Sequence, residues 1–123
     1  MKILIIEENP GLLRLLLALL SESGNEIRVC AEGTEALSLC ALEQPDWVVL
    51  DLNLARADGL SLTRQMRSLC PQTRVVLVAD EDDVRLRERA DQAGASQVIS
   101  KERLTELPAL LRGAECHCTT TIN

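Results

Sequence analysis

Short apolar runs rich in β-branched residues alternate with longer segments of helical periodicity along this chain of 123 residues. The apolar runs have the length of strands, and several of them are apolar throughout instead of alternating with polar residues. Strands of that kind are typical of a parallel sheet that helices cover on both faces. Five runs are predicted to be strands: Lys2–Ile6, Glu26–Cys30, Trp47–Asp51, Arg74–Ala79 and Gln97–Ser100.

A helical pattern follows each of these runs. The five predicted helices are Pro10–Ser23, Thr34–Leu42, Gly59–Leu69, Asp82–Ala93 and Glu102–Arg112. Pro10 is typical of a first helical turn, Thr34 of an N-cap, and Gly24 and Gly94 of C-terminal caps, while Pro108 indicates that the last helix is kinked or short. Strict alternation of strand and helix predicts an α/β fold with a doubly wound, five-stranded parallel sheet.

The composition excludes several classes of protein. The length fits one domain, and a formal net charge of −6 argues against a domain that grips nucleic-acid phosphates. The apolar start Met1–Ile6 is too short for a signal peptide, and the leucine-rich stretch Leu12–Leu20 is far shorter than the roughly 20 residues of a membrane span. We therefore expect a cytoplasmic domain that does not enter the membrane.

The five cysteines are an odd number at irregular spacing, which is a poor framework for disulfides. Three of them lie in apolar contexts, where a free thiol behaves as a small apolar side chain. The sequence therefore predicts free thiols and a reducing compartment. The cluster Cys116-His117-Cys118 is spaced too tightly for a usual zinc site, and no second pair accompanies it.

Charged side chains follow the strands at their carboxyl ends, where open parallel sheets bind ligands. Glu7 and Glu8 follow the first predicted strand, Asp51 ends the third, and Lys101 follows the fifth. Taken singly, such acids are often solvated loop ends or helix caps, as we expect for Glu81 and Asp83. Together, neighbouring carboxylates repel one another, and a divalent cation relieves that repulsion. An acidic pocket beside one lysine suits Mg²⁺ and an incoming phosphoryl group.

In this order, the segments resemble the receiver domain of response regulators, the two-component signalling family, over residues 2–112. Three segments carry the resemblance: the start Lys2-Ile-Leu-Ile-Ile-Glu-Glu-Asn-Pro10, the stretch Pro45-Asp-Trp-Val-Val-Leu-Asp51 with its continuation to Asp58-Gly59, and the approach Ala93-Gly-Ala95 to Lys101. The resemblance implies a (βα)5 flavodoxin-like three-layer sandwich over residues 1–113. Residues 114–123 are then a tail or the start of a linker to an output domain outside this chain.

The resemblance also implies roles for individual residues. Asp51 would accept a phosphoryl group from a sensor histidine kinase or a small phosphodonor. Glu8 and Asp51 would hold Mg²⁺ with Glu7 nearby and with the backbone carbonyl of Asn53 as a further ligand. Lys101 would pair with the phosphoryl oxygens. Such a domain regulates an output domain, most often a transcriptional one that binds DNA, or it forms a homodimer. It is a signalling phosphoprotein and not an enzyme.

This sequence departs from the family pattern at several positions. Glu8 stands where the second acid is usually Asp, and Ala55 stands where the loop has a proline. Ala79 replaces the switch hydroxyl, Val98 replaces its aromatic partner, and Asp80 follows where a small residue is usual. These departures keep an alternative open: a pseudo-receiver that acts as a protein-interaction module without being phosphorylated.

Two further alternatives remain from the residues themselves. A haloacid-dehalogenase-type phosphatase would show a second aspartate where this chain has Asn53, and a flavodoxin would show a glycine- and hydroxyl-rich loop where it has Glu7–Pro10.

The leucines of the first predicted helix span an apolar arc wider than one sheet face requires. Leu15 or Leu17 would then contact a partner or a second copy, unless the helix is deeply covered.

Overall fold

The computed structural model describes residues 1–22 and 24–120, with side chains as far as Gly113. Five parallel strands form one sheet in the order β2-β1-β3-β6-β7. Their bounds are β1 Lys2–Ile6, β2 Glu26–Cys30, β3 Trp47–Asp51, β6 Arg74–Ala79 and β7 Gln97–Ser100, which are the predicted ones. A small antiparallel ribbon of β4 (Asn53–Leu54) and β5 (Ala57–Asp58), which the sequence did not predict, follows β3 directly.

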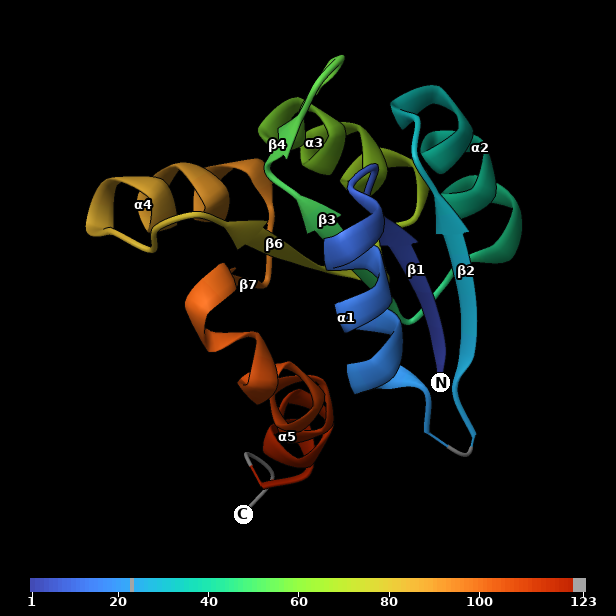
Figure 1. Ribbon diagram of the computed structural model, residues 1–123, viewed down its shortest axis with the longest axis vertical. Coiled ribbons are helices and arrows are strands. Elements are labelled where there is room, and N and C mark those ends of the chain that lie inside the picture. The colour runs from blue at the N-terminus through green and yellow to red at the C-terminus, as the bar shows by residue number, and fades with distance from the viewer. Residues whose placement is uncertain (23, 121–123) are drawn as a thin grey trace.

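Helices cover both faces of the sheet, which gives the three-layer (βα)5 sandwich that was predicted (Figure 1). The helices are α1 Pro10–Leu20, α2 Gly33–Glu43, α3 Gly59–Leu69, α4 Val84–Ala93 and α5 Leu107–Thr120, with a 3₁₀ helix at Lys101–Glu106 before α5. Alternate residues of each strand point to opposite faces. Leu4 and Ile6 of β1 therefore pack with α2, α3 and α4, whereas Ile3 and Ile5 pack with α1 and α5.

Helix ends differ from the prediction more than strands do. Helix α1 stops at Leu20 with Ser21 as its C-cap, so Gly24 lies beyond the helix in a turn with a φ of +96°. Helix α2 begins at Gly33 with Glu32 at its N-cap, so Thr34 lies inside it and is not the cap. Gly94 caps α4 in the left-handed conformation as predicted.

The segment after β7 is broken as Pro108 indicated. Arg103 departs from helical φ and ψ inside the 3₁₀ helix, and Pro108 occupies the first turn of α5, where its missing N–H costs nothing. Helix α5 continues to Thr120, beyond its predicted end at Arg112. The side chains of the Cys116-His117-Cys118 cluster lie outside the described part of the structure.

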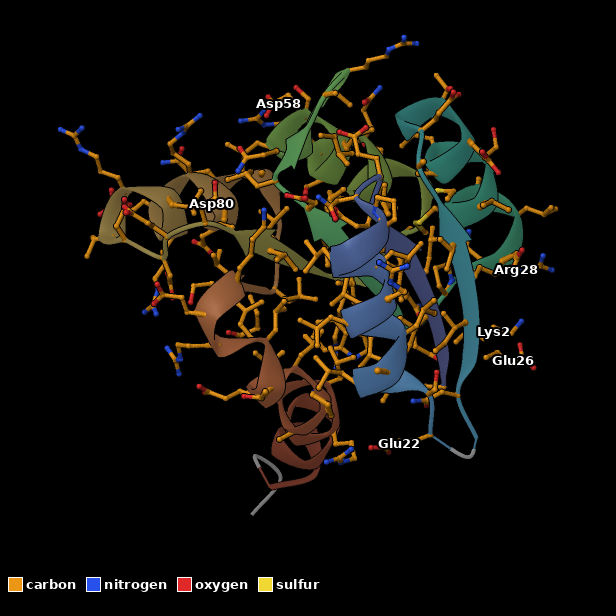
Figure 2. The ribbon with its side chains drawn as sticks, viewed as in Figure 1. Lys2, Glu22, Glu26, Arg28, Asp58 and Asp80 are labelled. Atoms are coloured by element: carbon orange, nitrogen blue, oxygen red, sulfur yellow. A yellow bond between two sulfur atoms is a disulfide. The ribbon has the colours of Figure 1, made fainter. Side chains whose placement is uncertain are left out.

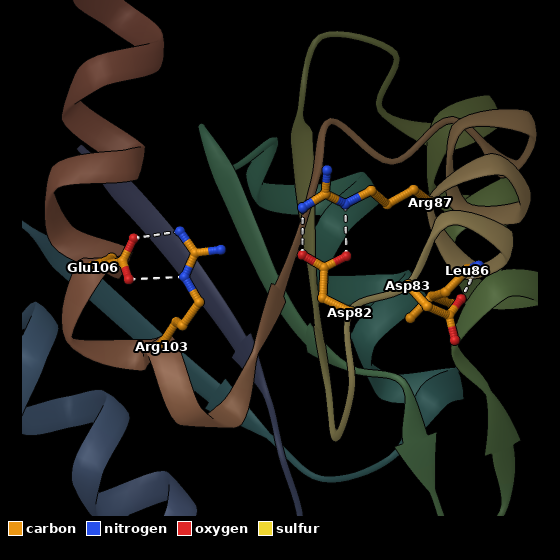
Figure 3. A network of polar contacts seen from close by, with 6 residues as sticks. All are labelled: Asp82, Asp83, Leu86, Arg87, Arg103 and Glu106. Atoms are coloured by element: carbon orange, nitrogen blue, oxygen red, sulfur yellow. Dashed lines mark hydrogen bonds and ion pairs between the residues drawn. The ribbon is translucent and has the colours of Figure 1, made fainter.

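Acids of the loop before α4 are engaged locally, as Figure 3 shows. The Leu86 N–H donates to the Asp83 side chain at 2.8 Å, so Asp83 caps the helix. Arg87 donates two hydrogen bonds to Asp82, at 2.7 and 2.6 Å, and this contact holds the pKa of Asp82 below its usual value. The prediction of a surface role for Asp83 is confirmed, and Glu81 is exposed beside it.

Cys40 and Cys70 form a disulfide, so the prediction of free thiols is wrong for this pair. Cys40 lies on the buried face of α2 and Cys70 is the C-cap of α3; their Cα atoms are 6.4 Å apart, a distance that a disulfide spans. Two residues separated by 30 positions gave no sequence signal, because the contact depends on how two helices pack. Cys30 is free and buried, and burial raises the pKa of its thiol to about 11.

Helix α1 lies mostly against the sheet and α5. Leu16 and Leu20 are buried and Leu12, Leu13, Leu17 and Leu19 pack partly against the same core. Leu15 is 44% exposed, which leaves one leucine of the wide arc facing outward. In the described part of the chain, no helix combines the length and apolar character that a membrane crossing requires.

Candidate functional site

Two carboxylates meet where β1 and β3 end side by side. Ile6 pairs with Leu50 in the parallel register, so Glu7 and Asp51 leave the sheet together. Each follows a fully apolar run, so each is buried: Glu7 is 2% exposed and Asp51 is 6% exposed. The predicted convergence of Glu7 and Asp51 is therefore present in the fold.

The loop that follows β3 orients the Asp51 carboxylate. The Asn53 N–H donates to Asp51 Oδ1 at 2.9 Å, and Lys101 Nζ lies 3.9 Å from Asp51 Oδ2. Gly59 permits this tight loop, because a Cβ there would meet the backbone Cα of Leu52 at 2.9 Å. The Asp51 carboxylate is thus held on one side by its own loop and faces the ammonium group of Lys101 on the other.

Glu7 is the most unfavourably placed charge in the described residues. Neither of its carboxylate oxygens has a hydrogen-bond partner there, although both are buried. Burial, with the adjacent Asp51 carboxylate, raises the pKa of Glu7 to about 8. A buried acid that lacks partners is costly unless it is neutralised, so this position calls for a proton or a cation.

The chemistry of Glu7 and Asp51 fits a magnesium ion. Mg²⁺ usually takes one or two carboxylates from a protein and keeps several waters, so these two acids suffice for it. Among the described residues, no group of three His, Cys, Asp or Glu side chains converges as a metal site. The carbonyl of Asn53, the backbone ligand that the resemblance implies, belongs to the same loop that orients Asp51.

Glu8 points to a different partner from the one predicted for it. Its carboxylate accepts a hydrogen bond from the Ala55 N–H at 2.6 Å, in the loop between β4 and β5. A proline at position 55 would have no N–H to donate, and an aspartate at position 8 would be one methylene shorter. The two departures from the family pattern therefore meet in a single hydrogen bond that ties the end of β1 to the loop after Asp51.

Lys101 pairs chiefly with a residue that the sequence did not single out as its partner. Its Nζ lies 3.0 Å from Asp80 Oδ1, closer than it lies to Asp51. Asp80 stands at the carboxyl end of β6, where Figure 2 labels it. The hydrogen bond from Lys101 to Asp80, with the charges of Asp51 and Glu7, raises the pKa of Lys101.

The two switch positions hold only apolar side chains. Ala79 ends β6 and is buried, with no hydroxyl to offer the site. Val98 is partly buried and packs against the core that α2, α3 and α4 cover. A relay between a hydroxyl and an aromatic ring therefore has no residues to carry it here.

Comparison with known proteins shows the family to which this fold belongs. The profile described as response regulator receiver domain matches residues 3–112. The response regulator MprA of Mycolicibacterium vanbaalenii is 34% identical over 116 residues, which are 90% of this chain and 50% of that protein. The chain thus spans about half the length of the curated relatives that it matches.

Solved structures show the same architecture. The BeF3-activated N-terminal receiver domain of Klebsiella pneumoniae RstA superposes with a TM-score of 0.81 at 32% identity, covering 91% of this chain and 96% of that one. The response regulator domain of Thermotoga maritima CheB gives a TM-score of 0.82 at 20% identity, covering 93% and 95%, which shows the fold alone.

The fold and its acidic edge define a signal-receiving α/β domain of the two-component type. This chain belongs to the response regulator receiver domain family. Two features of its site were not foreseen: the bond from Ala55 to Glu8 and the pairing of Lys101 with Asp80. The pairing of Lys101 with Asp80 depends on the register of β6 and β7: Ala79 and Ser100 are paired in the sheet, so the residues after them emerge together.

Proposed function

We propose that Asp51 accepts a phosphoryl group in a Mg²⁺-dependent reaction, and that the change in charge regulates an output. The observation that carries this proposal is the pair of buried carboxylates Glu7 and Asp51 beside Lys101. A family member that keeps two buried acids side by side next to a lysine keeps the electrostatic setting that phosphoryl transfer needs.

The chemistry follows from the residues at the edge of the sheet. An oxygen of Asp51 forms the new bond to phosphorus, and the bond from phosphorus to the donor oxygen breaks. With acetyl phosphate as donor, the leaving group would be acetate. Bound Mg²⁺ supplies the charge that offsets the phosphoryl oxygens. Glu7 and Asp51 would hold it, with Glu8 released from Ala55 or acting through water. Lys101 pairs with a phosphoryl oxygen in the product.

The wider assignment rests on the family. A sensor histidine kinase is the proposed phosphodonor and the cytoplasm the proposed location. The output domain, transcriptional by the habit of the family, is proposed to follow residues 1–113, since the curated relatives are about twice as long. A second copy of the chain is the other proposed partner.

A direct test uses intact mass. The chain is incubated with acetyl phosphate and Mg²⁺, and we expect a gain of one phosphoryl group that EDTA prevents. Asp51→Asn should abolish the gain, whereas Asp91→Asn, which removes an equal charge from the exposed surface of α4, should leave it unchanged. A gain that persists in Asp51→Asn would overturn the role of Asp51.

The pseudo-receiver is the second candidate, and the apolar switch positions Ala79 and Val98 favour it. It predicts no mass gain with any small phosphodonor and no binding of Mg²⁺ at millimolar concentration. Trp47 is buried at the start of β3, whereas Asp51 ends that strand, so calorimetry reports on the metal more directly than tryptophan fluorescence does. Binding of Mg²⁺ that Glu7→Gln removes would count against this candidate.

A further inference from the structure

Asp80 and Lys101 emerge side by side because their strands are in register. Ala79 of β6 pairs with Ser100 of β7, so the next residue on each strand leaves the sheet at the same edge. The result is an ion pair of 3.0 Å between Lys101 Nζ and Asp80 Oδ1. Asp51 Oδ2 lies farther from the same nitrogen, at 3.9 Å. In this state Lys101 is bound to Asp80 first and to Asp51 second.

The second oxygen of Asp80 makes a contact on the other side. Asn53 Nδ2 donates to Asp80 Oδ2 at 3.3 Å. Asp80 therefore links the loop after β3 to the start of the 3₁₀ helix after β7. The Asp80 side chain is 68% exposed whereas that of Asp51 is 7% exposed, so this link lies on the solvent side of the acceptor.

The groups that Asp80 occupies are ones that a phosphoryl group on Asp51 would need. A phosphoryl group is an anion with oxygen acceptors, and an ammonium and an amide N–H are its natural donors. A carboxylate is also an anion with oxygen acceptors, and the Asp80 carboxylate already contacts the same two donors, Lys101 Nζ and Asn53 Nδ2. Covalent attachment to Asp51 would bring a second anion next to it, and like charges repel.

We propose that Asp80 is a positioning residue that binds Lys101 and Asn53 as an internal substitute for the phosphoryl group and thereby slows phosphorylation of Asp51. This inference rests on the proposed function of Asp51. Because Asp80 is exposed, water and salt screen its pairing, so it moderates the reaction and does not prevent it.

The test compares four variants by intact mass over time with acetyl phosphate and Mg²⁺. Asp80→Asn and Asp80→Ala should be phosphorylated on the order of fivefold faster than the natural chain. Asp80→Glu, which restores the carboxylate, should return most of the slow rate. Glu81→Gln removes the same charge from the neighbouring exposed position and should change little. The acceleration should shrink as salt rises, since the competition is electrostatic.

A second measurement keeps the inference independent of phosphorylation. The Asn53 side-chain amide resonances of the metal-free protein should shift in Asp80→Ala but not in Glu81→Gln, because that amide donates its hydrogen bond to Asp80. Unchanged resonances would overturn the link itself. If all four variants were phosphorylated at the rate of the natural chain, while Asp51→Asn still blocked the mass gain, the inference would be overturned and Asp51 would remain the acceptor. No gain in any chain would remove the proposed function as well.

Discussion

Glu7 places a second carboxyl group beside Asp51 in surroundings that hide both from water. Its pKa of about 8, against an ordinary 4.5, means that the folded metal-free chain holds a proton that the unfolded chain releases. The stability that this proton contributes is complete below pH 4.5 and is lost as the pH rises to about 8. In EDTA, we expect the free energy of unfolding of the natural chain to fall across this window.

Glu7→Gln should remove that fall and, at pH 8, should stabilise the metal-free chain by at least about 1 kcal/mol, because an uncharged amide is less costly to bury than a carboxylate. Urea unfolding at several pH values measures both effects. Glu88→Gln, on the exposed surface of α4, is the matched control and should keep the slope of the natural chain. An unchanged slope in Glu7→Gln would show that Glu7 is not the titrating group.

The contacts of Glu8 and Asp80 were not predictable, because each depends on a tertiary feature that the sequence pattern does not encode. The sequence indicated that Glu8 and Ala55 were unusual, but these residues are 47 positions apart and nothing in the pattern joined them. Their hydrogen bond depends on the path of a loop and on a side-chain rotamer, which periodicity does not encode. The charge of Asp80 is visible in the sequence, whereas its partners depend on the register of β6 and β7.

Among the elements, α2 and α3 are joined by the Cys40–Cys70 disulfide, which closes a loop of 30 residues. In the chain-entropy account, a cross-link over a loop of that length stabilises a protein by about 3 to 4 kcal/mol. Reduction by a dithiol should therefore lower the free energy of unfolding by an amount of that order. Burial of both sulfurs should make native reduction slow, since exchange needs access for a thiolate.

The double variant Cys40→Ala with Cys70→Ala is the control for this measurement, and its stability should not respond to the reductant. Alkylation after unfolding counts the thiols: when reductant is added first, the natural chain should gain two alkyl groups more than it does without reductant. The same count with and without reductant would contradict the disulfide.

The bounds of the strands were predictable from the sequence, because buried strands are apolar from end to end. The pairing of α2 with α3 was not predictable, because packing between helices leaves no local pattern.

For the whole molecule, topology does most of the placing. A parallel sheet in the order β2-β1-β3-β6-β7 brings the carboxyl ends of β1, β3, β6 and β7 to one edge, so Glu7, Asp51 and Lys101 meet without any local sequence signal between them. The alternation of apolar and helical segments is enough to predict that meeting. The alternation does not predict which neighbouring side chain each charged group pairs with at that edge.

A cation that binds only the folded site should stabilise the entire domain. By mass action, a hundredfold excess of Mg²⁺ over its Kd adds about 2.7 kcal/mol to the free energy of unfolding. We expect urea midpoints to rise with Mg²⁺ and to stay unchanged with an equal ionic strength of NaCl, which screens charges but does not bind the acids. Glu7→Gln and Asp51→Asn should each lose most of the Mg²⁺ response, while Asp91→Asn should retain it. A response that survives both site variants would place the cation elsewhere on this acidic chain, and the proton on Glu7 would then be what relieves the repulsion within the buried pair.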